Sequence, residues 1–236
     1  MTAARSLSIV VPAYNEAANI AATLDNITAA LSTLPIVHEI LVVDDGSRDG
    51  TGAIVSAYAQ RCSAVRLVTN DRNRGFGWTY RRGVELAALD CIVMVHGDNA
   101  WSAGTLRSLF QCVGDADIVI GYTRNMWRSR TWTRAAISKT FTAFVNLITG
   151  RRLRYYNGLQ IHPAPVLKQL QIQSNGYGFQ AEVLAKSLKQ TRTFVEVPMD
   201  LTERAHGESK AFRVKNVIDV ARTLGLLCAL EWSAPK

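Results

Sequence analysis

Two short apolar runs near the start of the chain each end in side chains that could bind a polar ligand. The segment LSIVVPAYNE, at residues 7–16, ends in a tyrosine, an amide and a carboxylate. The segment ILVVDDGS, at residues 40–47, ends in two adjacent carboxylates, Asp44 and Asp45. Such runs are typical of buried parallel strands, and open α/β sheets bind their ligands at the carboxyl ends of these strands. The two segments therefore predict one polar site at a sheet edge.

The positive charge of the chain is concentrated in one segment. The formal net charge is +8, and residues 118–181 contain nine Lys and Arg but no Asp or Glu. The rest of the chain is therefore about neutral, at 8 − 9 = −1. A basic segment in a balanced protein predicts an anionic partner, such as nucleic acid, a diphosphate or an anionic lipid. No nucleic-acid recognition motif accompanies it, so we expect no nucleic-acid partner.

The whole chain has 236 residues, a length that suits one large domain. In its first half, strand and helix patterns alternate. The predicted strands lie at residues 7–12, 39–43, 65–69, 91–95 and 117–121, with helices at about 16–32, 51–61, 77–88 and 103–112. This rhythm predicts an α/β fold, a mostly parallel sheet flanked by helices. The second half is looser: a helix near 131–149, a short extended segment, a helix at about 178–190, a strand at 193–197 and a final helix at about 213–231.

Seven motifs follow one another through nearly the whole chain: VPAYNE, VVDDGS–DGT, N–RGFG, GDN, IVIG, GF–AE and RAHGESK. The chain resembles the family-2 glycosyltransferases of GT-A fold, and within them the dolichyl-phosphate mannose synthase-like branch. RxxGESK, at residues 204–210, is the motif that points to this branch. The resemblance implies one Rossmann-like glycosyltransferase domain over residues 1–236. Its nucleotide-sugar-binding half would span about 7–122, and its acceptor-binding half, with the C-terminal helix, about 123–236.

The resemblance implies a nucleotide-binding role for the first strand ends. A nucleotide needs an apolar or aromatic wall for its base and carboxylates that accept N–H and O–H groups. The residues implied are Pro12, Tyr14, Glu16, Asp44, Asp45 and Gly75. A glycine lets the backbone approach a ligand closely. Two adjacent aspartates also suit an ordinary turn and helix cap, which stays an alternative.

The resemblance also implies a divalent cation. The family normally holds the ion with a DxD motif after the fourth strand, where this chain reads His96-Gly97-Asp98-Asn99. Mg²⁺ prefers oxygen ligands, whereas Mn²⁺ accepts imidazole more readily. We therefore expect a Mn²⁺ or Mg²⁺ site on Asp98, with His96 either as a second ligand or as a structural hydrogen-bonding group.

Three residues are expected to act in catalysis: Asp98, Glu182 and Arg204. The family places a GF–E carboxylate, here Glu182, near the acceptor. The same residue also suits the first turn of a helix, where the helix dipole favours an acid. Arg204 belongs to the RxxGESK segment, whose cations could clamp the donor diphosphate or the acceptor phosphate.

Further side chains are expected to bind phosphate or the acceptor: Arg124, Arg134, Ser209 and Lys210. The branch usually has an aspartate four residues before the glycine of YYNG, where this chain has Arg154. A lipid phosphate is already an anion near neutral pH and needs no strong base, so the loss of that carboxylate is tolerable. A hydroxyl acceptor would need a base. The acid-free basic segment favours the phosphate.

We predict an inverting glycosyltransferase that moves a hexose from GDP-mannose or a UDP-hexose to a polyprenyl or dolichyl phosphate. Two alternatives stay open: transfer to a hydroxyl acceptor in cell-surface glycan synthesis, and a non-catalytic nucleotide-sugar-binding homologue. No run approaches the roughly 18–20 apolar residues of a membrane span. We expect a cytoplasmic protein, peripheral at the inner membrane face, where its partners would be the anionic lipid and a membrane subunit.

Overall fold

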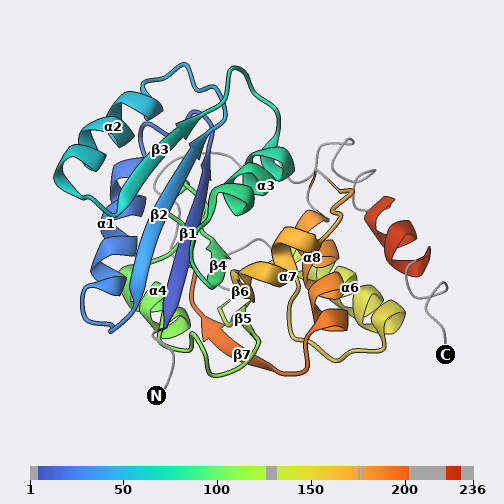
Figure 1. Cartoon of the computed structure of the whole chain (residues 1–236). Coiled ribbons are helices and arrows are strands. Elements are labelled where there is room, and N and C mark those ends of the chain that lie inside the picture. The colour runs from blue at the N-terminus through green and yellow to red at the C-terminus, as the bar shows by residue number, and fades with distance from the viewer. Residues whose placement is uncertain (1–4, 126–131, 175, 177, 202–221, 230–236) are drawn as a thin grey trace.

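A single mixed sheet organises the chain (Figure 1). The computed structural model describes residues 5–125, 132–174, 176, 178–201 and 222–229. The strands are β1 (Ser6–Ala13), β2 (Val37–Asp44), β3 (Val65–Thr69), β4 (Cys91–Met94), β5 (Ile118–Thr123), β6 (Gln160–Pro163) and β7 (Phe194–Met199). Their order across the sheet is β3-β2-β1-β4-β6-β5-β7, and β6 alone among them runs antiparallel to its neighbours. The predicted mostly parallel α/β sheet is confirmed.

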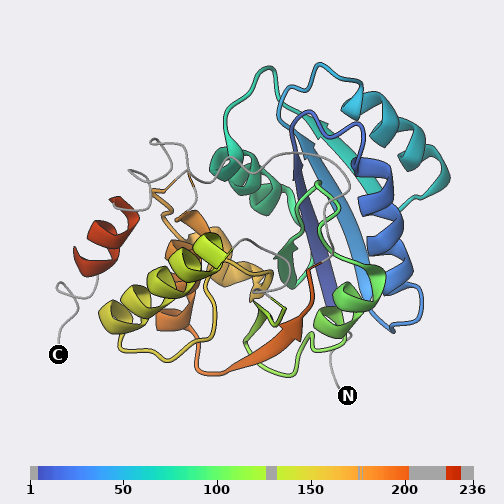
Figure 2. The same cartoon turned by 180° about the vertical axis from the view of Figure 1, so that it is seen from behind.

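Helices cover both faces of this sheet (Figures 1 and 2). They are α1 (Ile20–Leu31), α2 (Thr51–Arg61), α3 (Phe76–Leu86), α4 (Ala103–Phe110), α6 (Trp132–Thr149), α7 (Ala164–Gln169) and α8 (Phe179–Gln190), with a further helix at 222–229. The short helix α7 was not predicted, because its six residues are too few for a helical period to show. No helix in the described part of the chain is long and apolar enough to cross a bilayer.

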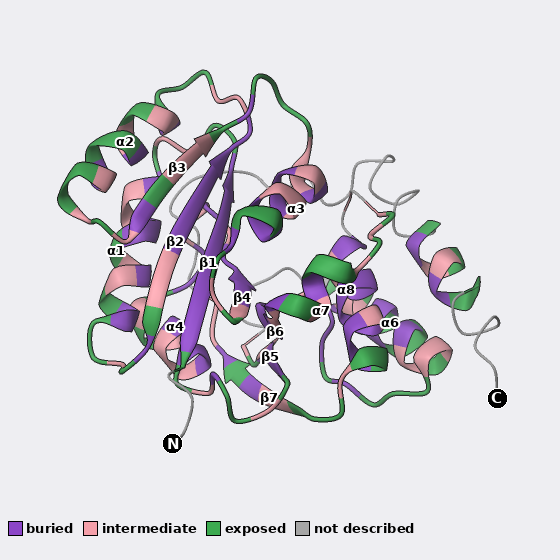
Figure 3. Cartoon of the chain, viewed as in Figure 1, coloured by how far each residue is buried: buried purple, intermediate pink, exposed green. Residues whose placement is uncertain are grey.

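The alternation of side chains along β1 builds two apolar layers. Leu7, Ile9 and Val11 belong to the cluster under α1, α2 and α4, while Val10 belongs to the cluster under α3 and α7. All four side chains are fully buried, because successive residues of a central strand point to opposite covered faces. Figure 3 shows this strand as buried along its length.

A third apolar cluster anchors the second half of the chain to the same sheet. Ile118 and Ile120 of β5 pack with Phe141 and Val145 of α6, and side chains of α8 and of the helix at 222–229 join them. The cluster therefore ties α6, α8 and the helix at 222–229 to β5.

The first helix begins four residues later than predicted, at Ile20 instead of residue 16. The backbone N–H groups of Asn15, Glu16 and Ala17 donate to Ser47, Thr51 and Asp49, at 2.9, 2.9 and 3.0 Å. Because the neighbouring loop supplies these acceptors, the segment stays a loop, and Asn15 adopts a positive φ of 56°. The predicted cap of α4 is confirmed, since the Ser102 side chain accepts from the Thr105 N–H.

The contact between α3 and β1 leads to a stability prediction. A Cβ at Gly83 would overlap the buried Val10 side chain, so Gly83→Ala is expected to lower the free energy of unfolding by about 2 kcal/mol. Gly104, in α4, has open space around its Cα, so Gly104→Ala is expected to leave stability unchanged or to raise it by about 0.5 kcal/mol. Urea denaturation of both variants measures the difference, and equal stability would contradict the close packing of α3 on β1.

Candidate functional site

The carboxyl ends of β1 and β2 are locked together by hydrogen bonds between their loops. The Asp45 N–H donates to the Ala13 carbonyl at 2.8 Å, and the Arg48 N–H donates to the Asn15 side chain at 3.0 Å. Asp44 accepts from the Ser47 N–H at 3.0 Å and from its hydroxyl. These bonds satisfy backbone donors that would otherwise lack partners at a sheet edge.

Asp45 joins β2 to the loop that follows β3. Its Oδ1 accepts from the Asn70 side chain and from the Arg74 N–H, both at 2.8 Å, and its Oδ2 accepts from the Gly75 N–H at 2.8 Å. Gly75 has a φ of +91°, which favours glycine at this position. Asp45 is almost completely buried, so in this structure its carboxylate shapes the loop. This agrees with the turn alternative given for the two aspartates.

Tyr14 lies at the open rim of this edge. The residue is 42% exposed, whereas Pro12, two residues earlier, is buried within β1. Glu16 is partly buried and accepts a hydrogen bond from the Asn19 side chain at 2.8 Å. The exposed ring therefore offers an apolar surface beside polar backbone, which is the combination that a nucleoside base needs.

The turn that holds Asp98 is fixed onto α1. The Thr23 hydroxyl donates to the Gly97 carbonyl at 3.0 Å and accepts from the Asn99 N–H at 3.0 Å. The Asn26 side-chain amide donates to the Asn99 side chain at 2.8 Å. Asn99 has a positive φ of 54°, which turns the chain sharply after Asp98. Sequence reasoning missed Thr23 and Asn26, since neither stands in a recognisable motif.

His96 is held by a stacking contact. Its ring lies parallel to that of Phe76, the first residue of α3, with centroids 5.1 Å apart and planes 5° apart. Phe76 in turn meets Phe179 of α8 edge to face at 6.1 Å. His96, which stands at the first position of the DxD motif, thus links the end of β4 to α3 and, through Phe76, to α8. These ring contacts support a structural role for His96.

The residues present fit a divalent ion that the substrate helps to bind. Among the described residues, no group of three or more His, Cys, Asp or Glu side chains is placed to hold a metal. Asp98 is partly exposed and supplies the hard carboxylate oxygen that Mg²⁺ and Mn²⁺ favour. Such ions commonly take one or two protein carboxylates together with phosphate oxygens. One carboxylate is therefore a sufficient protein contribution if a diphosphate completes the site.

Glu182 has a structural environment. Its side chain is fully buried and accepts from Lys186 Nζ at 2.5 Å and from the N–H groups of Gln173 and Ser174 at 2.9 and 2.7 Å. Burial raises the pKa of this carboxyl, but the hydrogen bonds outweigh it and leave the pKa below its usual value of 4.5. This placement favours the structural alternative over the catalytic role that we expected.

The predicted phosphate-binding cations are only partly within the described chain. Arg124 follows β5 and forms an ion pair with Asp200 just after β7, while 65% of its side chain stays exposed. Arg134 lies in α6, but its side chain is outside the description, and Arg204, Ser209 and Lys210 lie outside the described residues. Arg154 stacks on Tyr122 near the end of β5, with its guanidinium 4.7 Å from the ring and 2.6 Å from the hydroxyl.

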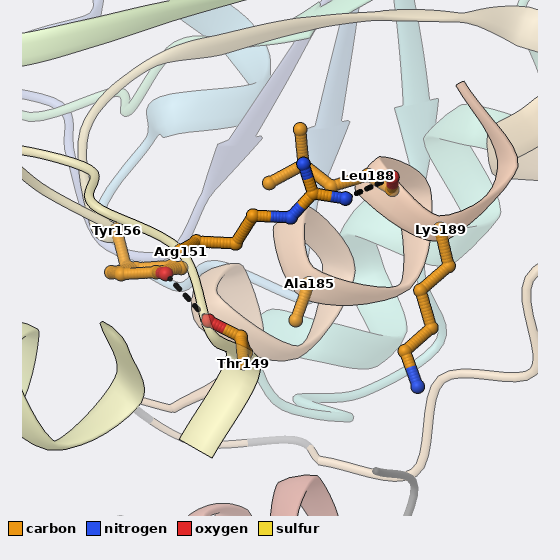
Figure 4. A pocket seen from close by; sticks show the side chains of 6 residues that line it. All are labelled: Thr149, Arg151, Tyr156, Ala185, Leu188 and Lys189. Atoms are coloured by element: carbon orange, nitrogen blue, oxygen red, sulfur yellow. Dashed lines mark hydrogen bonds between the residues drawn. The ribbon is translucent and has the colours of Figure 1, made fainter. Parts of the chain in front are cut away.

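Two hollows in the described structure lie outside the donor part of the sheet edge. One, of about 90 Å³, is bordered by Thr149 at the end of α6, by Arg151 and Tyr156 after it, and by Lys189 of α8 (Figure 4). The other is a groove between α4 and β7 that reaches Arg124 and Asp200, just after β5 and β7. We place the candidate site along the strand ends, where the polar side chains and the exposed ring lie.

The match to a family model decides the family. The description of that model is glycosyl transferase family 2, and it matches residues 8–165, a stretch that includes the ends of β1, β2, β3, β4 and β5. The chain belongs to glycosyl transferase family 2. As a member of this family, it is a glycosyltransferase.

Relatives of this family-2 glycosyltransferase include the undecaprenyl-phosphate mannosyltransferase of Micrococcus luteus, 30% identical over 212 residues, or 85% of either chain. The polyprenol monophosphomannose synthase of Mycolicibacterium smegmatis is 29% identical over 86% of this chain and 79% of its own. The fold is that of glucosyl-3-phosphoglycerate synthase from Mycobacterium tuberculosis, solved with Mn²⁺, UDP-glucose and phosphoglyceric acid. That structure has a TM-score of 0.72 at 20% identity and covers 99% of this chain and 82% of its own, which confirms the GT-A fold.

The Glu182 environment leads to a pH prediction. Since the folded-state pKa is lowered, the ion pair contributes stability above the unfolded value near 4.5, and this contribution is lost as pH falls through that value toward the folded one. Glu182→Gln is expected to cost about 2 kcal/mol at neutral pH and to weaken the loss of stability in acid. Lys186→Met, which leaves the carboxylate buried and unpaired, is expected to cost about 3 kcal/mol.

Denaturant unfolding between pH 7 and pH 3 measures both effects for these variants. The same pH slope in the wild type and in Glu182→Gln would show that this carboxylate does not contribute to acid sensitivity.

Proposed function

We propose that this glycosyltransferase transfers a hexose from a nucleotide-sugar donor to a polyprenyl phosphate, with inversion at the anomeric carbon. One observation carries the proposal: the β5 end of the sheet edge holds arginines whose side chains stay exposed even though they pair with acids. The β1, β2 and β4 ends hold carboxylates, whereas Arg124 and Arg154 at the β5 end are more than 60% exposed beside Asp200 and Glu196. The first part suits a nucleotide and the second suits an anionic acceptor.

The donor would occupy the edge between β1 and β4. The exposed Tyr14 ring provides a stacking surface for a base, and the loops fixed by Asp44 and Asp45 keep that surface in place. Asp98 stands at the end of the neighbouring strand, where the diphosphate would follow the nucleoside. Mn²⁺ or Mg²⁺ bound by Asp98 would supply positive charge against the charge that develops on the leaving diphosphate.

The acceptor chemistry explains why a strong general base is dispensable. A phosphate monoester is already anionic near neutral pH, so its oxygen can attack the anomeric carbon without losing a proton first. Direct displacement of the nucleoside diphosphate inverts that carbon. Arg154, which replaces the aspartate usual in this branch, adds positive charge where such a phosphate would lie. The relatives in Micrococcus and Mycolicibacterium are named for polyprenyl-type phosphate acceptors, which supports the same class here.

Removal of the metal-binding oxygen tests the Asp98 assignment. Asp98→Asn keeps the shape of the turn but weakens the charge, so kcat/KM is expected to fall at least about 100-fold. EDTA is expected to abolish transfer by the wild type, and added Mn²⁺ is expected to restore it. Asp115→Asn is the matched control, because Asp115 is exposed and pairs with Arg5 away from the strand ends. Full activity in EDTA would contradict the metal assignment.

A comparison of two acceptors tests the proposed function. The purified protein is given radiolabelled GDP-mannose, UDP-glucose or another UDP-hexose, with either a short-chain polyprenyl phosphate or the corresponding prenol. Label is expected only in the phosphate product, with the anomeric configuration opposite to that of the donor. Arg154→Gln is expected to raise KM for the phosphate about tenfold, since an exposed guanidinium contact is lost.

Two outcomes would contradict the proposal. Transfer to the prenol in preference to the phosphate would show a hydroxyl acceptor. Donor binding in a thermal-shift assay, with neither transfer nor hydrolysis in the presence of Mn²⁺, would show a non-catalytic nucleotide-sugar-binding protein.

A further inference from the structure

Exposed apolar side chains gather on one helix. Within the described chain, eight large hydrophobic side chains are exposed, and four of them belong to α6: Trp132, Ile137, Phe144 and Leu147. Leu147 is 80% exposed and Trp132 is 73% exposed, the two largest values of the eight. The other four are spread over separate elements, which is ordinary for a protein surface. A cluster of this kind marks an interaction site.

The helical period places three of these residues on one outward face. Ile137, Phe144 and Leu147 are separated by seven and three residues, which are about two turns and one turn of a helix. The buried side of the helix lies next to this face, since Phe141 and Val145 are buried in the cluster with β5 and α8. A helix normally buries such an apolar stripe against its neighbours. Here the apolar surface extends beyond the part that the described elements cover, and α6 lies at the surface of the molecule (Figure 2).

The charge around α6 indicates the kind of partner. Residues 118–181 contain no acidic residue, and the exposed cations of this helix and of the chain just after it include Lys139, Arg151 and Arg152. An exposed apolar face in a segment that has cations and no acids is complementary to an anionic lipid bilayer, which takes up the apolar groups and attracts the charges. A second copy is disfavoured, because a two-fold contact would set these like charges against each other.

We propose that α6 is a membrane-docking helix that lies flat on an anionic bilayer through Ile137, Phe144 and Leu147. The helix follows β5, whose carboxyl end holds the cations assigned to the acceptor phosphate. Docking through α6 would therefore bring the acceptor end of the sheet edge to the lipid surface. The inference rests on the proposed function for its purpose, since a lipid acceptor must be reached at a bilayer, but vesicle binding measures it separately.

A vesicle-binding assay tests the docking helix. The probe is phosphatidylcholine vesicles with about one third phosphatidylglycerol, followed by co-sedimentation. The wild type is expected to bind these vesicles more tightly than pure phosphatidylcholine and to lose affinity as salt increases. Phe144→Ser with Leu147→Ser is expected to weaken binding at least about tenfold, because two apolar side chains no longer enter the interface. Val37→Ser with Leu86→Ser is the matched control, because these exposed residues lie in β2 and α3.

The controls separate this inference from the proposed function. Circular dichroism and thermal melting must show that the α6 variant folds, and transfer to a short-chain, water-soluble polyprenyl phosphate is expected to match the wild type. Equal vesicle binding by both double variants would overturn the docking helix. A second result would also overturn it: the wild type forms a dimer on gel filtration and does not bind vesicles, and the α6 variant is a monomer. Failure of the proposed function would appear as absent transfer by the wild type, whatever the vesicles show.

Discussion

The backbone groups at the carboxyl edge of the sheet must find hydrogen-bond partners, and this constraint shapes the site. Six parallel strands end at that edge, and each continues into a loop whose N–H groups have left the ladder. Side chains of adjacent loops satisfy them: Ser47 and Thr51 accept from the β1 loop, and Asp45 accepts from the β3 loop. The conformation of each loop therefore depends on that of its neighbour. Because these loops are already ordered, the binding of a ligand here would lose less conformational entropy than binding to flexible loops.

This constraint changes how the two aspartates after β2 should be understood. Both carboxylates are buried and accept hydrogen bonds from their own turn or the next loop, so their first role is to build the edge. The accessible groups that we propose for donor binding are the Tyr14 ring and, after β4, the partly exposed Asp98. Thr23 fixes the Asp98 turn from α1 and is itself almost completely buried. The groups that position this turn therefore differ from the groups proposed for contact with the donor.

The sequence predicted the sheet, the order of its elements and the family, because these depend on local periodicity and on contiguous motifs. It could not predict the contacts between loops, since the partner of each group is chosen by strand order. Asn70 is an exception: it follows β3 as Asp45 follows β2, so its place at the carboxyl end of a parallel strand could have indicated it, although not its bond to Asp45. Glu182 illustrates the opposite case, because a motif suggested a reacting acid and the fold buried it against Lys186. The late start of α1 has the same origin, in acceptors supplied from another loop.

The second half of the chain combines an apolar core with a basic surface. Its core is the apolar cluster between β5, α6 and α8, and its cations are left at the surface with few acids to pair with them. Arg124 pairs with Asp200 and Arg154 lies close to Glu196, yet both arginine side chains stay more than 60% exposed, so solvent screens these pairs and an incoming anion can compete for them. Under the proposed function, the diphosphate of the donor needs a cation at a fixed point, whereas a lipid phosphate that moves in a bilayer can be met by a broader positive surface. The proposed function would therefore account for the contrast between the tightly bonded edge and the open basic half by the different freedom of these two substrates.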